Sequence, residues 1–113
     1  MTVSYSNFFT PTQLTSTAAT LFTVPVQPTT TLLRGGRMRF TNTSALAATV
    51  TAYAVPAAGT AATTNAFVSS KTIAANDFLD MDLPVLPAGA FIQALSGTLS
   101  SITAHMISGS YFA

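Results

Sequence analysis

Apolar and polar residues alternate with a period of two through much of the chain, most clearly in residues 32–55. In the first half of this stretch, Met38 and Phe40 alternate with basic and hydroxyl-bearing residues. Successive side chains of a strand leave opposite faces of a sheet, so the pattern predicts one core face and one exposed face. Residues 48–55 alternate in the same way. Between the two runs, residues 42–44 favour a turn, because their side chains can form hydrogen bonds with the nearby backbone.

Further short runs of this kind follow one another along the chain, separated by prolines, glycines and small polar residues. Such punctuation is typical of short strands, since proline cannot donate to a strand ladder. No window keeps a helical period over the usual length of a helix. The runs predict an all-β fold, an antiparallel β-sandwich of jelly-roll or similar type, with about eight to ten short strands. Besides residues 32–55, they are 19–24, 29–34, 66–70, 71–74, 79–83, 90–95 and 101–108.

The length of 113 residues is that of one domain, and we expect residues 13–113 to form a single sandwich. Residues 1–12 are predicted to be an N-terminal arm or edge strand. Tyr5, Phe8 and Phe9 are large apolar anchors there, among serine, asparagine and threonine. Two interpretations stay open. The segment is either an edge strand of the chain's own sheet or an extended arm that pairs with a neighbouring subunit, as donated strands do.

Charged residues make up only 6% of the chain, against about 25% in ordinary soluble domains, while 49% of residues are hydrophobic. Such a surface is kept in water by hydroxyl groups or is covered by other subunits. A net charge of +1 argues against nucleic acid as the main partner. No apolar run is long enough to span a membrane, and the N-terminus lacks the pattern of a signal peptide. We therefore expect a protein that is not exported by a signal peptide and has no membrane partner.

Candidate catalytic chemistry is sparse. The chain has one histidine, His105, and no cysteine. The residue types of a Ser-His-Asp triad are all present, but the Gly-x-Ser-x-Gly turn that presents such a serine is absent. Asp80 and Asp82 share one strand face, as a hard cation would require, yet no acidic loop surrounds them to complete its oxygen ligands. The sequence predicts no enzyme, no cofactor and no metal site.

Two short charged stripes hold most of the charge. Arg37 and Arg39 form a basic stripe on one predicted strand, and Asp80 and Asp82 form an acidic stripe on another. If the two strands are neighbours in one sheet, the stripes form exposed cross-strand ion pairs worth at most about 1 kcal/mol each. If they are not, the stripes could meet between subunits and fix the choice of partner. Together with Tyr5, Phe8 and Phe9, these four residues are the candidate subunit or partner interface.

Several turn-and-strand segments resemble those of small virion proteins of tailed bacteriophages. In that group a Tyr/Phe-Thr-Val-Pro turn leads into a strand, an Asn-Thr-Ser hairpin follows, and a Pro-Ala-Gly turn precedes the penultimate strands. The resemblance extends over residues 20–108. The matching segments are 21–25 (LFTVP), 31–34 (TLLR), 39–44 (RFTNTS), 48–56 (ATVTAYAVP) and 86–94 (LPAGAFIQA).

The resemblance implies a non-enzymatic β-sandwich building block of a bacteriophage virion. The leading expectation is a capsid decoration, or cement, protein that binds the major capsid protein and assembles as a symmetric homo-oligomer, commonly a trimer. A tail, connector or fibre component is the alternative, including a carbohydrate-binding module. A carbohydrate reader would need clustered exposed aromatics, yet the chain has no Trp and three Tyr. An ice- or surface-binding protein would need threonine rows in a regular repeat, and the chain has none of fixed period.

Overall fold

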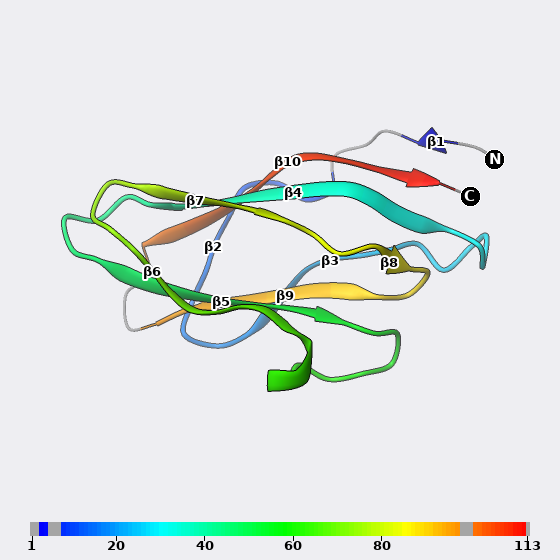
Figure 1. The fold of residues 1–113 in the computed structure, drawn as a ribbon, viewed down its shortest axis with the longest axis horizontal. Helices are drawn as coiled ribbons and strands as arrows, with labels where there is room; N and C mark the ends of the chain where they lie inside the picture. The colour runs from blue at the N-terminus through cyan, green and yellow to red at the C-terminus, as the bar shows by residue number, and fades with distance from the viewer. Residues whose placement is uncertain (1–2, 5–7, 98–100, 113) are drawn as a thin grey trace.

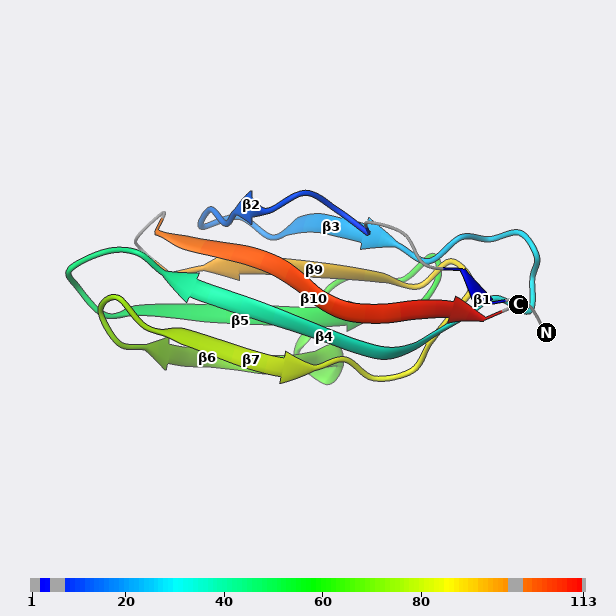
Figure 2. The same ribbon diagram turned by 90° about the horizontal axis from the view of Figure 1, so that it is seen from above.

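The computed structural model describes residues 3–4, 8–97 and 101–112, with side chains from Phe8 onward. It consists of two stacked antiparallel sheets, seen edge-on in Figure 1 and from above in Figure 2. The strands are β1 (Val3–Ser4), β2 (Thr12–Gln13), β3 (Ala19–Thr23), β4 (Leu32–Asn42), β5 (Ala48–Val55), β6 (Ala66–Ile73), β7 (Phe78–Asp82), β8 (Leu86–Pro87), β9 (Phe91–Ser96) and β10 (Ile102–Phe112). One short 3-10 helix, η1 (Thr63–Asn65), precedes β6.

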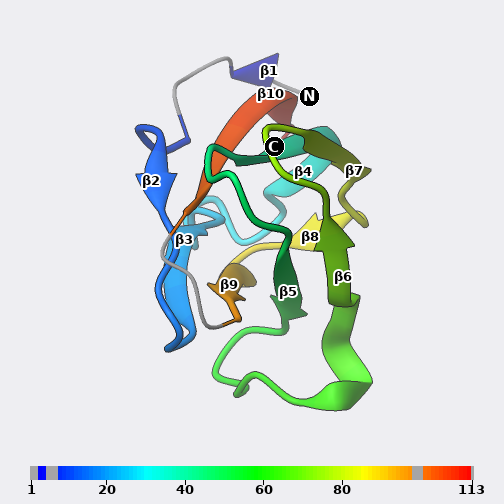
Figure 3. The ribbon, with the colours of Figure 1, turned by 90° about the vertical axis from the view of Figure 1, so that its left-hand side faces the viewer.

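The strand order identifies the architecture as a jelly roll. The first sheet has the order β1-β10-β4-β7, with β2 also paired to β10 and β8 paired to β4. The second sheet has the order β3-β9-β5-β6. Every strand pairing is antiparallel. The sheet with the order β2-β10-β4-β7 faces the sheet with the order β3-β9-β5-β6, which is the arrangement of an eight-stranded jelly roll (Figure 3). The predicted antiparallel β-sandwich is confirmed.

The core lies between the sheets and is built from the inward positions of the central strands. Alternate residues there are fully buried, whereas their neighbours keep some exposure, as the period of two predicts. Full burial of each large apolar side chain stabilises the fold by about 1.5–3 kcal/mol. Fully buried core residues include Leu33, Met38, Phe40, Val50, Ala52, Ile92, Ala94, Ile102 and Ala104.

The turn at residues 42–44 does not join two neighbouring strands, so the Asn-Thr-Ser hairpin that the resemblance implies there is wrong. Strands β4 and β5 belong to different sheets, so the turn between them crosses from one layer to the other. Met38 and Phe40 enter the core from one side, and Val50 and Ala52 enter it from the opposite side. Alternation tells which face of a strand is buried, but two strands that bury the same kind of face can line either one sheet or two facing sheets.

Asn42 anchors this crossing as a fully buried polar side chain. Its Nδ2 donates to the carbonyl oxygens of Leu46, Ile73 and Ala74, over 2.8, 3.1 and 3.2 Å. Its Oδ1 accepts hydrogen bonds from the Ser44 backbone N–H and the Ser101 hydroxyl, each over 3.0 Å. The predicted local bonding of residues 42–44 is therefore present, and the same side chain also ties together three connections at one end of the sandwich.

Two predicted strand boundaries also differ from the structure. The strand expected over residues 29–34 starts only at Leu32, because the N–H and hydroxyl of Thr31 both donate to the Pro28 carbonyl and form a turn. The runs 66–70 and 71–74 are one strand, β6, interrupted by irregularities in its pairing with β5. Among the residues that the structure describes, no helix has the length and apolar character needed to cross a membrane.

Candidate interaction surfaces

The two charged stripes lie side by side on the outer face of the first sheet. Strands β4 and β7 are neighbours, with Arg37 opposite Asp82 and Arg39 opposite Asp80. The Arg39 Nε donates to Asp80 Oδ1 over 2.7 Å, and its Nη2 donates to Asp80 Oδ2 over 3.0 Å. The Arg37–Asp82 pair is looser, with 3.6 Å between Nε and Oδ1. The intramolecular alternative thus describes the stripes, and their role between subunits stays a prediction.

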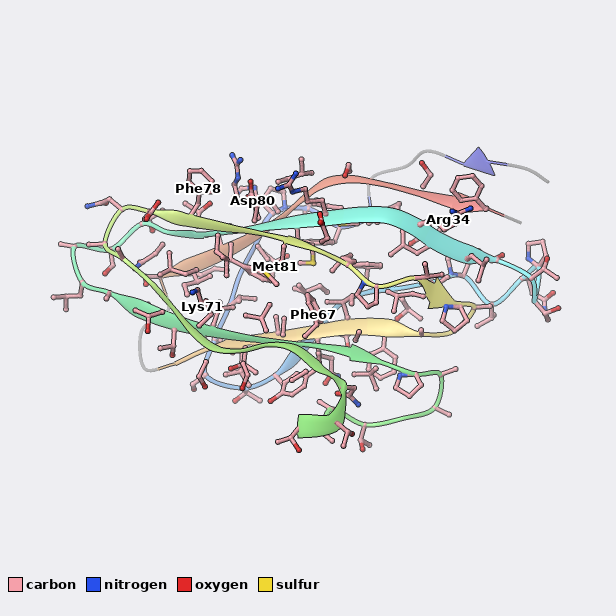
Figure 4. All side chains as sticks on the ribbon, in the orientation of Figure 1. Arg34, Phe67, Lys71, Phe78, Asp80 and Met81 are labelled. Atoms are coloured by element: carbon pink, nitrogen blue, oxygen red, sulfur yellow. The ribbon has the colours of Figure 1, made fainter. Side chains whose placement is uncertain are left out.

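Phe78 adds an aromatic ring to this face that the sequence did not single out. The Arg39 guanidinium carbon lies 4.2 Å from the centre of the Phe78 ring. Phe78 itself is 51% exposed. Figure 4 shows Phe78 and Asp80 on the side of the first sheet that faces away from the second. Hydrogen bonding to Arg39 lowers the pKa of Asp80, and hydrogen bonding to Asp80 raises the pKa of Arg39. The Arg39 side chain thus contacts both a carboxylate and an aromatic ring.

Phe8 and Phe9 lie against the sandwich of their own chain. The Phe8 ring stacks on Tyr111 with 4.5 Å between centroids and lies 5.3 Å from Phe22, and Phe9 stacks on Phe22 at 5.8 Å. Phe22 comes from β3 and Tyr111 from β10, so these rings bridge the two sheets along one long side. Tyr5 lies outside the described residues. Exchange of segment 1–12 with a neighbouring subunit stays a prediction.

Gly109 makes room for this aromatic cluster. A Cβ at Gly109 would lie 2.9 Å from Phe8 Cε2, and the φ of 147° at this position is one that other residues rarely adopt. Burial raises the pKa of the Tyr111 hydroxyl, and the Tyr111 ring stacks on Phe8. The Phe8 ring thus occupies space that Gly109 leaves free.

The opposite long side of the sandwich, between β6 and β7, is an open groove of about 420 Å³. Phe67, Leu79 and Met81 form its apolar walls, and each is partly buried against the core. Phe67 and Met81 lie between the two sheets in Figure 4. Val68, Ser69 and Lys71 complete the lining. No motif in the sequence brings these six residues together as one site.

Irregular pairing in β6 shapes the groove. Between Lys71 and Val68, β6 has one residue more than its partner β5, and between Val68 and Ala66 it again has one more. Ser70 adopts a φ of 46° there, and its N–H donates to the Thr51 hydroxyl over 3.0 Å. Bulges of this kind re-aim side chains and often occur beside functional sites. Lys71, the only lysine of the sequence, was the available sequence signal.

The described residues contain no cluster with the composition of a metal site. No group of three or more histidine, cysteine or acidic side chains is found there. His105 lies opposite Arg39 across β10 and β4, beside the charged stripes. Both acidic groups of the acidic stripe face arginines, so their negative charge is already compensated.

The comparisons with known proteins concern the fold. No protein-family model matches the chain, and no curated protein sequence matches it. A structure of infectious bursal disease virus, Gx strain, matches 97% of this chain at 19% identity and a TM-score of 0.51. A crystal structure of the infectious bursal disease virus VP2 subviral particle also matches 97% of this chain, at 21% identity and a TM-score of 0.46. This chain covers 32% of each of those chains. The similarity to the first is one of fold.

Proposed function

We propose that this chain is a non-enzymatic structural subunit of a virus particle. The observation that carries the proposal is the jelly-roll strand order, β2-β10-β4-β7 facing β3-β9-β5-β6, which is a recurrent architecture of viral capsid domains. The fold-level match to a virus structure supports it. So does the composition, since a chain with only 6% charged residues suits a subunit that other proteins cover.

Within that class, we favour a capsid decoration protein of a tailed bacteriophage. The turn and strand segments shared with small phage virion proteins support this choice. The subunit would assemble as a symmetric homo-oligomer, with a trimer favoured, and would attach to the major capsid protein in the virion. Light scattering during size-exclusion chromatography would then give about three times the chain mass of 11.7 kDa. A monomer at every concentration and salt would exclude the trimer.

Cosedimentation separates decoration from other virion roles. A decoration protein binds a surface that several coat subunits form only in the assembled lattice. It should therefore pellet with the assembled shells of the virus that encodes it. It should not bind the unassembled coat subunits of that virus. Equal binding to shells and to free coat subunits would contradict decoration, and no binding to either would contradict attachment to a capsid.

A tail or fibre component that binds carbohydrate is the second candidate, because the outer face of the second sheet offers a suitable surface. Tyr53 on β5 lies opposite Gln93 on β9, and the Gln93 amide donates to the Thr20 hydroxyl over 3.0 Å. A partly exposed tyrosine beside amide and hydroxyl groups suits a sugar, and jelly rolls also occur as lectin domains. A glycan array separates the two candidates. Binding that Tyr53→Ala abolishes would favour this one.

A further inference from the structure

The two long sides of the sandwich differ, because one is covered by aromatic side chains and the other is open. On the side of β3 and β10, Phe8 and Phe9 cover the gap between the sheets and stack on Phe22 and Tyr111. On the other side, β6 and β7 are the last strands of their sheets, and the described part of the chain leaves the groove of about 420 Å³ open. That volume is in the range of protein sites that bind small ligands, roughly 300–1,000 Å³.

The groove combines apolar walls with one uncompensated positive charge. Phe67, Leu79 and Met81 pack on the core, yet each keeps part of its surface exposed. Lys71 is exposed beside them, and neither ion pair found among the described residues involves it. The carboxylates of β7 are engaged by arginines on the outer face of the sheet. A ligand with an apolar group and a carboxylate would complement this groove.

The outer edges of β6 and β7 favour an extended peptide as that ligand. Both are terminal strands, so each leaves one row of backbone N–H and C=O groups without a strand partner in the described structure. An added strand would satisfy such a row while its alternate side chains enter a pocket. A second copy of β7 is a poor occupant. Antiparallel self-pairing about its centre would place Asp80 opposite Asp80, and like charges directly opposite are destabilising.

We propose that this groove docks an extended segment of a partner protein. The segment would pair with the free edge of β7, insert an aromatic or aliphatic side chain against Phe67 and Met81, and place a carboxylate near Lys71. It would close this side of the sandwich as Phe8 and Phe9 close the other. The inference rests on the proposed function, because we assign the segment to the protein of the viral shell.

Two synthetic peptides test the groove without any particle. The first is acetyl-Thr-Phe-Thr-Asp-Thr-amide, in which phenylalanine and aspartate share one face of a strand, and the second carries lysine in place of aspartate. Titrations into the ¹⁵N-labelled full chain should shift amide resonances of β6 and β7. The aspartate peptide should bind about threefold more tightly, as a single exposed ion pair allows. Equal affinities, shifts confined to other strands or no binding of either peptide would overturn the proposal.

Charge reversal supplies the matched control. Lys71→Glu should invert the order, so that the lysine peptide binds more tightly. Arg34→Glu should leave the order unchanged, because Arg34 lies beside Phe112 on the first sheet and does not line the groove. Met81→Gln keeps the length of the side chain but makes the wall polar, and it should weaken both peptides about fivefold. An unchanged peptide order in Lys71→Glu would overturn the role of the lysine.

Cosedimentation with shells then tests the role of the groove separately from the proposed function of the whole chain. If the wild-type chain pellets with shells and Lys71→Glu does not, both proposals are supported. If both proteins pellet equally, the groove is not the docking site although the virion role stands. If the wild-type chain binds no shell, attachment to the capsid fails, and the peptide titrations still decide whether the groove binds extended segments.

Discussion

Arg39 on β4 donates two hydrogen bonds to Asp80 on β7, from Nε to Oδ1 over 2.7 Å and from Nη2 to Oδ2 over 3.0 Å. This contact lowers the pKa of Asp80, so its ionised form is favoured in the folded chain relative to the unfolded one. The stabilisation is fully present above the unfolded pKa of about 3.9. It is lost as the pH falls through the lower folded pKa.

Asp80→Asn should therefore lower stability at pH 7, and its difference from wild type should shrink as the pH falls below about 4. Urea denaturation midpoints at pH 7, 4 and 3 measure this effect. Asp82→Asn is the matched control, since that side chain is 86% exposed and its contact is 3.6 Å long. A larger effect of the Asp82 variant at pH 7 would contradict the assignment.

Asn42→Ala should cost about 3 kcal/mol of unfolding free energy. The substitution removes the donor for the carbonyls of Leu46, Ile73 and Ala74 and the acceptor for Ser44 and Ser101, and unsatisfied buried groups are costly. Thr43→Ala, on the exposed side of the same turn, should cost less than about 1 kcal/mol. Chemical denaturation compares the two, and equal costs would mean that Asn42 does not organise this end of the sandwich.

Gly97→Ala should destabilise the fold by about 1–3 kcal/mol, because the added Cβ would meet the Thr49 hydroxyl oxygen. The backbone bond from the Gly97 N–H to the Thr49 carbonyl, at 2.9 Å, keeps the two residues together. In the background Thr49→Ala, the clash disappears and Gly97→Ala should cost much less. A double-mutant cycle measures this coupling, and strictly additive effects would rule out the close approach.

Phe8→Ala should lower the unfolding free energy by about 2 kcal/mol, less than for a fully buried phenylalanine. The same change should bring the pKa of Tyr111 down towards the ordinary tyrosine value of about 10, because it uncovers the hydroxyl-bearing ring. NMR titration of Tyr111 follows this shift. Tyr53→Ala, on the second sheet, is a control that should not alter the Tyr111 pKa. An unchanged Tyr111 in Phe8→Ala would show that Phe8 does not cover it.

The sequence predicted the fold class well because each strand carries its own information about burial. The alternation around Met38 and Phe40 indicates a buried face whatever strand lies beside it. The partner of a strand is a long-range property. The sequence therefore could not tell that β4 and β5 lie in different sheets, and the expected hairpin at residues 42–44 was wrong.

Interaction surfaces were predicted less completely. The basic and acidic stripes could be found because each is periodic, but their pairing follows from the β4–β7 register. The β6 side of the groove, with Phe67 and Lys71, could not be found by alternation, since two irregularities in β6 break the period that alternation relies on. Phe78 was missed because its contact with Arg39 joins residues far apart in the chain.

Quantitative mass spectrometry of density-purified particles tests the central claim most directly. The particles would come from the virus that encodes the chain, washed at high salt to strip loosely bound protein. A virion structural subunit should remain at a fixed ratio of copies to coat protein, the same in independent preparations. Loss of the chain into the soluble fraction, or a ratio that varies between washes, would contradict a structural place in the particle.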